Sequence, residues 1–304
     1  MEPDDVQLSK LIDMENPHSV LDEVRTIVFM IFSEFDFEPV NRVFADVVKL
    51  FRGEYPGHRV CNTEYHDLKH TTDSMLAMIR LIHGAILQGE TLPQENVSLG
   101  IISALLHDTG YIQTSDDDQG TGAKYTLVHI ERSIEFTHNY FTEKGFSLAD
   151  FENCRDILNC TGLNTKINDI PFKSKEIELL GKMLGTADLL GQMADRTYLE
   201  KLLFLYHEFR EGNVAGYSSE TELLKKTLGF YDIAKKRFAD ELGSVNKYLV
   251  YHFRKRWNID RELYQDAIEK NMNYLKHILA NHEKEYRDHL RRGGVVNRLD
   301  EESM

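Results

Sequence analysis

The sequence predicts an all-α protein, and two observations carry that prediction. Over most of the 304 residues, apolar side chains recur at intervals of three and four, whereas strict alternation of apolar and polar residues is almost absent. Proline is scarce, with 6 residues, and stretches rich in Leu, Ile, Glu, Lys and Met favour helices over a many-turned β-sandwich. The hydrophobic content of 41% is enough for one large domain or two small ones.

The N-terminal two thirds of the chain predict a series of amphipathic helices. Residues 1–16 are polar and acidic without a sustained period, so we expect a loose arm there. The first helix, 18–35, follows Pro17, which the first turn of a helix tolerates, and the second, 40–51, leads into a loop that runs to about Thr63. Helical spacing then predicts helices at 65–87, 96–107, 125–141, 148–160, 175–190 and 196–209.

The last third of the chain predicts a helical extension. Residues 212–216 form a glycine-containing break, and long charged helices are expected at 220–242 and 260–291. We therefore divide the chain into a core of residues 17–212 and an extension of residues 213–304. The extension could equally pack back on the core as part of one bundle.

The charge and the cysteines exclude several classes of protein. With 36 Lys and Arg against 50 Asp and Glu, the net charge of −14 argues against nucleic acid as a partner. The longest apolar runs, 27–32 and 99–106, fall far short of the roughly 20 residues of a membrane span. The acidic start lacks the apolar stretch of a signal peptide, and three cysteines without CxxC spacing make a disulfide framework or a thiolate zinc site improbable. We expect a cytoplasmic protein that does not bind membranes.

The segment YHDLKHTTD, residues 65–73, is the first candidate site. His66 and His70 are four residues apart and Asp73 is three further, so on a helix all three project from nearly the same face. One imidazole can then bind a metal while the other points at a substrate. The same spacing also occurs on ordinary helix surfaces.

The segment ALLHDTGY, residues 104–111, is the second candidate. An apolar helix ends directly in His107 and Asp108 before Gly110 breaks it, and at a helix end the two side chains can converge on one ion or a pair of ions. An imidazole beside a carboxylate suits Mn, Mg, Fe or Zn. Alternatively, His107 interacts with the helix dipole while Asp108 caps a turn.

Asp188 stands inside an apolar helical stretch and is the third candidate. A buried carboxylate is costly unless it is paired, caps a helix or binds metal, and these alternatives stay open. By contrast, His277, His282 and His289 lie on a charged predicted helix without a supporting pattern, so we expect them to face solvent.

The order of these motifs resembles the HD superfamily of metal-dependent phosphohydrolases. A histidine pair, a His-Asp dipeptide and a lone aspartate follow one another on helices, over about residues 60–195. YHDLKHTTD is similar to the YHNxxHAxD signature of class I cyclic nucleotide phosphodiesterases, and ILNCTGLN, residues 157–164, is similar to a threonine-containing helix of that fold. The resemblance implies an HD-type catalytic helical domain over residues 17–212.

The resemblance also implies a site with two divalent metal ions and a hydrolytic mechanism. His70, His107, Asp108 and Asp188 would hold the first metal, and Asp108 would bridge to a second that is completed mainly by water. The metals would lower the pKa of a bridging water, whose hydroxide attacks phosphorus. His66 would be the general acid that protonates the leaving oxygen.

This chain departs from the phosphodiesterase pattern HDxxHxGxxN, because Tyr111, Gln113 and Asp116 replace its second His, its Gly and its Asn. No glutamine matches the one that clamps a purine ring in that family. The implied substrate is therefore a small phosphoric ester, either a nucleotide or a cyclic-nucleotide-like mono- or diester. The alternative function is a nucleotide-binding sensor without turnover that signals through the helices after residue 218.

Two further residues are candidates for phosphate contacts. His129 sits where other HD proteins often place an extra histidine near the second metal, although it could equally be a residue at the edge of the core. Lys124, at the start of the same predicted helix, could neutralise a phosphate oxygen.

Overall fold

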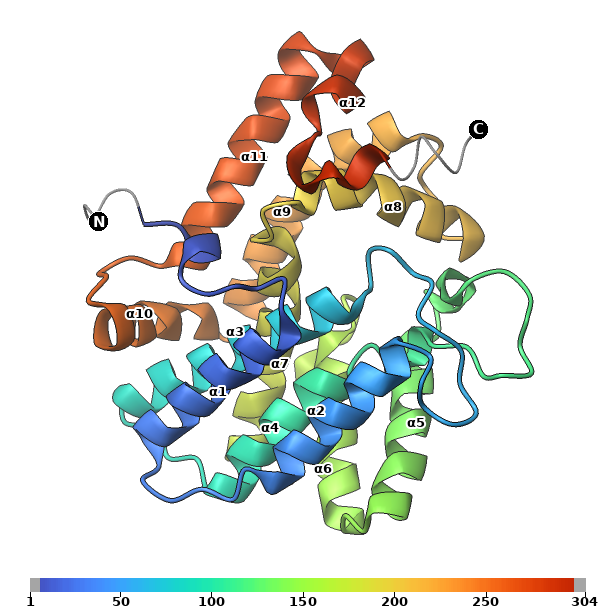
Figure 1. Cartoon of the computed structure of the whole chain (residues 1–304). Helices are drawn as coiled ribbons and strands as arrows, with labels where there is room; N and C mark the ends of the chain where they lie inside the picture. Colours follow the sequence, from blue (N-terminus) through green and yellow to red (C-terminus); the bar gives the residue numbers. More distant parts are fainter. Residues whose placement is uncertain (1–5, 298–304) are drawn as a thin grey trace.

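The computed structural model describes residues 6–297 and confirms the all-α prediction. Within these residues, the backbone forms α-helices and short 3-10 helices, and the one isolated β-bridge joins His58 and Thr114 (Figure 1). The α-helices are α1 Pro17–Ile31, α2 Glu38–Phe51, α3 Leu68–Leu87, α4 Gln94–Leu106, α5 His129–Lys144, α6 Leu148–Leu158, α7 Lys175–Met193, α8 Tyr198–Glu211, α9 Glu220–Asp240, α10 Leu249–Trp257, α11 Leu263–Asn281 and α12 Tyr286–His289. None of the described helices is both long and apolar enough to cross a membrane.

Helix α3 is the central element of the bundle. Every side chain from His70 to Ala85 is buried, and the helix packs against α1, α4, α7 and α10. At Gly84 a Cβ atom would lie 1.9 Å from the carbonyl oxygen of Tyr248, so only glycine allows this approach. The residues after the break at 212 thus pack on the same bundle as the residues before it.

The start of α3 differs from the expected one. Asp67 is the N-cap, with its carboxylate accepting a hydrogen bond of 2.8 Å from the backbone N–H of His70, and the helix begins at Leu68. The prediction that His66, His70 and Asp73 share one helical face is therefore wrong. His66 precedes the helix, and Asp73 pairs with Lys69 at 2.6 Å.

The extension also differs in two places. The single helix expected over 260–291 is wrong, because α11 ends at Asn281 and a 3-10 turn, Glu283–Glu285, separates it from α12. Helix α10 was not predicted, since a helix of 9 residues with buried Leu249, His252 and Phe253 shows too little period to be recognised.

Both ends of the described chain lie against the bundle. Residues 1–5 of the expected N-terminal arm and 298–304 of the extension lie outside the described residues. The rest of the arm contains a short 3-10 helix with Leu8 buried, next to α11. Near the other end, Arg292 donates to Glu200 at 3.0 Å and to Asn271 at 3.0 Å, which joins the chain after α12 to α8 and α11.

A buried histidine pair joins α3 to α10. The Nδ1 atoms of His83 and His252 are 2.9 Å apart, and both side chains are almost fully buried. Burial, with the nearby charges of Lys255 and Arg256, lowers the pKa of His83 from 6.5 to about 4. Burial and the charge of Arg80 also lower the pKa of His252. Both imidazoles therefore stay neutral in the folded protein at mildly acidic pH.

We expect this pair to make the stability depend on pH. Below pH 6.5 the unfolded chain protonates His83 while the folded chain does not, so the free energy of unfolding should fall as the pH drops from 6.5 to about 4. The contribution is up to about 1.4 kcal/mol per pH unit for one histidine. In urea titrations between pH 4.5 and 6.5, His83→Gln should show a smaller slope than the wild type. The exposed control His138→Gln should keep the wild-type slope, and an equal slope in both variants would contradict the assignment.

Candidate metal centre

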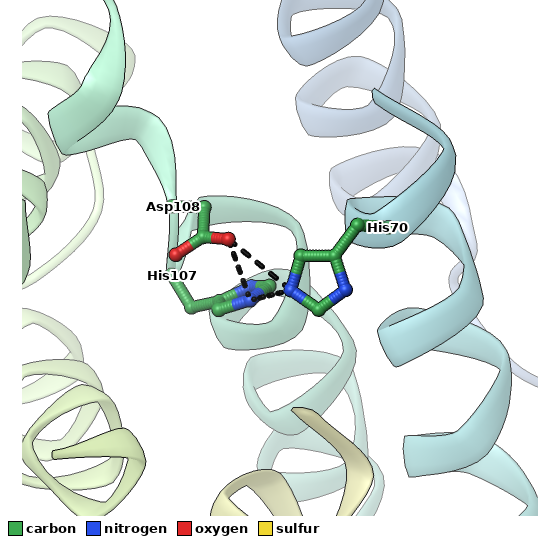
Figure 2. Close-up of side chains that lie close together, drawn as sticks. All are labelled: His70, His107 and Asp108. Carbon is green, nitrogen blue, oxygen red and sulfur yellow. Dashed lines mark hydrogen bonds and ion pairs between the residues drawn. The ribbon is translucent and has the colours of Figure 1, made fainter. Parts of the chain in front are cut away.

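Two histidines and two aspartates from three helices converge inside the bundle. His70 lies in the first turn of α3, His107 is the C-cap that follows α4, Asp108 comes next, and Asp188 is on α7. His70 Nε2 is 3.2 Å from Asp108 Oδ2 and 3.1 Å from Asp188 Oδ1. His107 Nε2 is 3.3 Å from Asp108 Oδ2 and 3.2 Å from His70 Nε2 (Figure 2). The structure thus brings together the four residues named as ligands of the first metal.

A sharp turn after α4 places His107 and Asp108 at this point. Helix α4 is buried along most of its length and ends at Leu106. The hydroxyl of Ser133 then donates to the carbonyl of His107 at 2.6 Å and accepts from the N–H of Gly110 at 2.9 Å. A Cβ atom at Gly110 would lie 2.0 Å from the carbonyl oxygen of His129, so a larger residue would push α5 away from the turn.

A hydrogen bond at the far side of the His107 ring decides which of its nitrogens faces the cluster. His107 Nδ1 is 2.8 Å from the carbonyl oxygen of Ala104, which can only accept, so Nδ1 carries the proton of the neutral ring. The lone pair of Nε2 then points at His70 and the carboxylates. Asp108 Oδ2 is buried there without a hydrogen bond from the described residues. A lone pair facing an unsatisfied carboxylate oxygen fits a bound cation.

The electrostatics of the cluster favour positive charge. Burial would lower the pKa of His70, but the neighbouring carboxylates of Asp108 and Asp188 raise it to about 9. The pKa of His107 is raised by the same carboxylates against the effect of burial. Burial would raise the pKa of Asp108 and of Asp188, yet the facing imidazoles hold both well below the usual range. Protons or a metal ion can supply the positive charge that the two carboxylates require.

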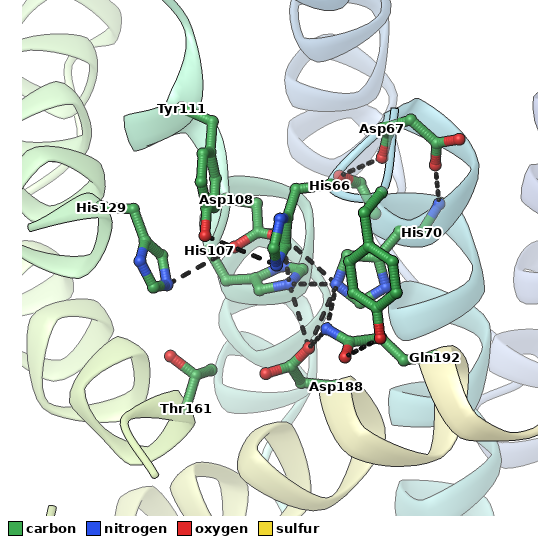
Figure 3. Close-up of polar contacts among 12 residues, drawn as sticks. His66, Asp67, His70, His107, Asp108, Tyr111, His129, Thr161, Asp188 and Gln192 are labelled. Carbon is green, nitrogen blue, oxygen red and sulfur yellow. Dashed lines mark hydrogen bonds and ion pairs between the residues drawn. The ribbon is translucent and has the colours of Figure 1, made fainter. Parts of the chain in front are cut away.

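His66 lies beside this cluster in a fixed orientation. Its Nδ1 is 2.7 Å from Glu208 Oε2 on α8, and Glu208 Oε1 also accepts from the N–H of Tyr65 at 2.7 Å. The ring stacks on Tyr111 with centroids 4.3 Å apart, and its centroid is 6.1 Å from that of His70. Glu208 thus holds Nδ1, while Nε2 is on the side of Tyr111, 3.5 Å from its hydroxyl (Figure 3).

His129 and Thr161 lie at the edge of the cluster. His129 Nε2 is 4.0 Å from Asp108 Oδ1, and its Nδ1 is held at 2.7 Å by the carbonyl of Thr126. Thr161 lies across from Asp108, below His129 in the view of Figure 3. The exposed fraction of the side chain is 22% for His129 and 13% for Asp188, against 1% for His107. Solvent therefore reaches the cluster from the side of His129 and Asp188.

Lys124 is engaged elsewhere. It lies in a 3-10 turn, Gly122–Tyr125, and its ammonium pairs with Asp117 of the acidic loop. The expected helix from residue 125 begins only at His129, so Lys124 belongs to the loop and not to the helix. The charge available for a phosphate oxygen is thus already paired within the loop.

Three residues with a supporting role were not recognised in the sequence. Gln192 donates to Asp188 Oδ1 at 3.0 Å, and its position four residues later on α7 is a signal that could have been found. Glu208 is 142 residues from His66, and its acidic, amphipathic surroundings give no sign of burial. Arg237 of α9 donates to the carbonyls of Cys160 and Gly162 at 3.0 and 2.8 Å and so holds the turn that carries Thr161.

Comparison with known proteins places the chain in a family. A family model, described as Npun_R2479-like, matches residues 57–249, which is more than half of the chain. The chain belongs to this family. The matched region of the Npun_R2479-like family includes the whole cluster, from His66 to Glu208. No curated protein matches the sequence.

We expect Asp108 to be required for binding divalent metal. Asp108→Asn keeps the size of the side chain but removes the charge of an oxygen that contacts both imidazoles, so the affinity for Mn²⁺ should fall at least about 100-fold. Isothermal titration of the metal-free protein with Mn²⁺ measures the change. The control Asp116→Asn removes one exposed acid from the loop and should bind as the wild type does. Unchanged binding by Asp108→Asn would contradict the assignment of this ligand.

Proposed function

We propose that the protein is a metal-dependent hydrolase of small phosphoric esters, with a nucleotide or a cyclic-nucleotide-like ester as the substrate. One observation carries the proposal. A buried imidazole lone pair, on His107 Nε2, faces a second imidazole and two carboxylates at 3.2 to 3.7 Å. The resemblance of the motifs to HD phosphohydrolases supports the same conclusion.

The ligand set suits divalent ions with open coordination positions. The first ion would be held by His70, His107, Asp108 and Asp188. The second carboxylate oxygen of Asp108, Oδ1, lies on the side of His129 and would be available to a second ion. Bound divalent ions would supply Lewis-acid polarisation of the phosphoryl group and activate water as the nucleophile. Two nitrogens and two carboxylates are compatible with Mn, Mg, Fe or Zn.

His66 is placed to act as the general acid. With Nδ1–H donated to Glu208, a second proton on Nε2 is the one available for transfer. In the proposed step, the oxygen of water would form a bond to phosphorus while the bond from phosphorus to the leaving oxygen breaks. The leaving oxygen would take the proton from Nε2, and the proton lost by the water would pass to solvent. Glu208 holds Nδ1 at 2.7 Å and keeps the ring from rotating, so it is a positioning residue.

The surroundings indicate how a phosphate group would be recognised. Because Lys124 is paired with Asp117, the phosphate charge would be met by the metal ions. The stacked rings of His66, Tyr111 and His129, with centroids 4.3 and 4.7 Å apart, form one wall of the site. A small ester fits this arrangement better than a polymer, in agreement with the net charge of −14.

A screen of mono-, di- and cyclic nucleotides with Mn²⁺, Mg²⁺, Fe²⁺ and Zn²⁺ tests the proposed activity. We expect metal-dependent release of phosphate or opening of the ring in the wild type, and no turnover by Asp108→Asn. Phosphate assays and chromatography of the products measure the reaction. Tight nucleotide binding without turnover under all four metals would instead favour the sensor function.

The proposed roles of His66 and His70 can be separated with the leaving group. His70→Ala should lose metal and all hydrolysis. His66→Ala should keep its metal but lose roughly 10² to 10⁴-fold in rate on esters with poor leaving groups, the usual contribution of a general acid. With a nitrophenyl phosphodiester, whose leaving oxygen needs little protonation, the loss should shrink markedly. Exposed His138→Ala serves as the matched control, and equal losses on both substrates would show that the proton comes from another group.

A further inference from the structure

A second group of histidines converges at the end of α11, far along the chain from the buried cluster. His282 is the C-cap that follows α11, Glu285 closes the 3-10 turn, and His289 is the last residue of α12. Their ligand atoms lie within 4.8 Å of one another. Figure 1 shows α12 folded back beside the end of α11, away from the helices that carry the buried cluster.

The break after α11 creates this convergence. On one straight helix, residues 282 and 289 would be about 10 Å apart along the axis. In the structure, the rings of His282 and His289 stack with their centroids 3.9 Å apart, at an angle of 27°. Within the described part of the chain, no hydrogen bond uses a ring nitrogen of either residue. Two imidazoles with available nitrogens thus stand next to a carboxylate.

We propose that His282, Glu285 and His289 form a transition-metal site, separate from the buried cluster, for an ion such as Zn²⁺. Two imidazoles and one carboxylate are ligands that zinc accepts, and they leave a fourth position for water. Mg²⁺ and Ca²⁺ prefer shells made of oxygen, so this set discriminates against them. All three residues are at least partly exposed, which gives the ion a direct path from solvent.

Contacts of the neighbouring residues hold the three ligands in place. The hydroxyl of Tyr274 donates to the carbonyl of His289 at 2.8 Å, and the N–H of His282 donates to Ile278 at 2.7 Å. Between them, Arg287 donates to Glu220 of α9 at 2.6 Å. The backbone on both sides of the turn is thus fixed without a metal, so little conformational entropy opposes binding.

His277 is the nearest additional imidazole. Its ring centroid is 5.6 Å from that of His282, and its Nδ1 lies 3.2 Å from the side-chain nitrogen of Asn281. It is not one of the three converging ligands. Because its ligands would be His282, Glu285 and His289, a bound ion would join the end of α11 to α12. The hydrogen bond from Arg287 to Glu220 would in turn connect this site to α9.

The test counts zinc ions in full-length protein and uses two backgrounds, wild type and Asp108→Asn. In each background, His282→Ala/His289→Ala should lose one equivalent of Zn²⁺ relative to its parent in isothermal titration and in metal analysis after dialysis. Glu285→Gln should bind the same ion roughly tenfold more weakly. Mg²⁺ should give no signal that depends on these residues. The control His18→Ala/His138→Ala removes two other exposed histidines and should lose no zinc.

Two outcomes would overturn the proposal. One is that His282→Ala/His289→Ala binds as much zinc as its parent in both backgrounds, with unchanged circular dichroism. The other is that zinc shows no preference over Mg²⁺ for the site. If instead the buried cluster binds no metal, the result is different. Asp108→Asn would then bind as much metal as the wild type, while His282→Ala/His289→Ala would still lose one equivalent of zinc.

Discussion

The buried carboxylate of Asp108 and the largely buried carboxylate of Asp188 are the constraint on which the rest of the structure depends. Removing two negative charges from water costs several kcal/mol for each ion unless opposite charge compensates them. The fold meets this cost by bringing His70 and His107 to within 3.7 Å of these oxygens. Close packing makes that possible, because at Gly191 the backbone of α7 approaches α3 so nearly that a Cβ atom would lie 3.1 Å from Ser74 Oγ. A side chain there would require Ser74 on α3 to move by a few tenths of an ångström.

Ion pairs around the start of α3 fix the segment that carries His66. Asp67 caps α3 and also accepts from Lys201 of α8 at 2.8 Å, while Lys69 joins Asp73 to Asp195 at 2.6 and 3.3 Å. These partly buried pairs tie the start of α3 to the end of α7 and to α8. The same helix α8 supplies Glu208 to His66, so its position sets the orientation of that imidazole. Helix α9, through Arg237, holds the turn that carries Thr161 at the edge of the cluster. Helices α8 and α9 therefore position residues of the site.

The parts that the sequence predicted well are those that local chemistry determines. The apolar run before His107 ends where a polar pair and Gly110 follow, and α4 does end there, at Leu106. Asp188 within an apolar helix predicted a partnered carboxylate, and its Oδ1 does lie 3.1 Å from His70 Nε2, although 13% of the side chain is exposed. The start of α3 was predicted too early, because the spacing of His66 and His70 suggested a helix and Asp67 was not recognised as its N-cap. The partnership of His66 with Glu208 spans 142 residues and depends on how α8 packs, which no local pattern encodes.

Helix ends, more than spacing along a helix, decide which imidazoles meet in this protein. His66 and His70 have the spacing of one helical face, yet they are neighbours because the chain turns at Asp67 before α3 begins. His282 and His289 are seven residues apart and would be about 10 Å apart along a continuous helix, yet a turn after Asn281 stacks their rings. His107 faces the cluster because α4 stops one residue before it. A break in a helix frees the backbone to change direction and brings together side chains that a continuous helix would keep apart. The same physical event therefore underlies the buried centre and the group of histidines at the end of α11.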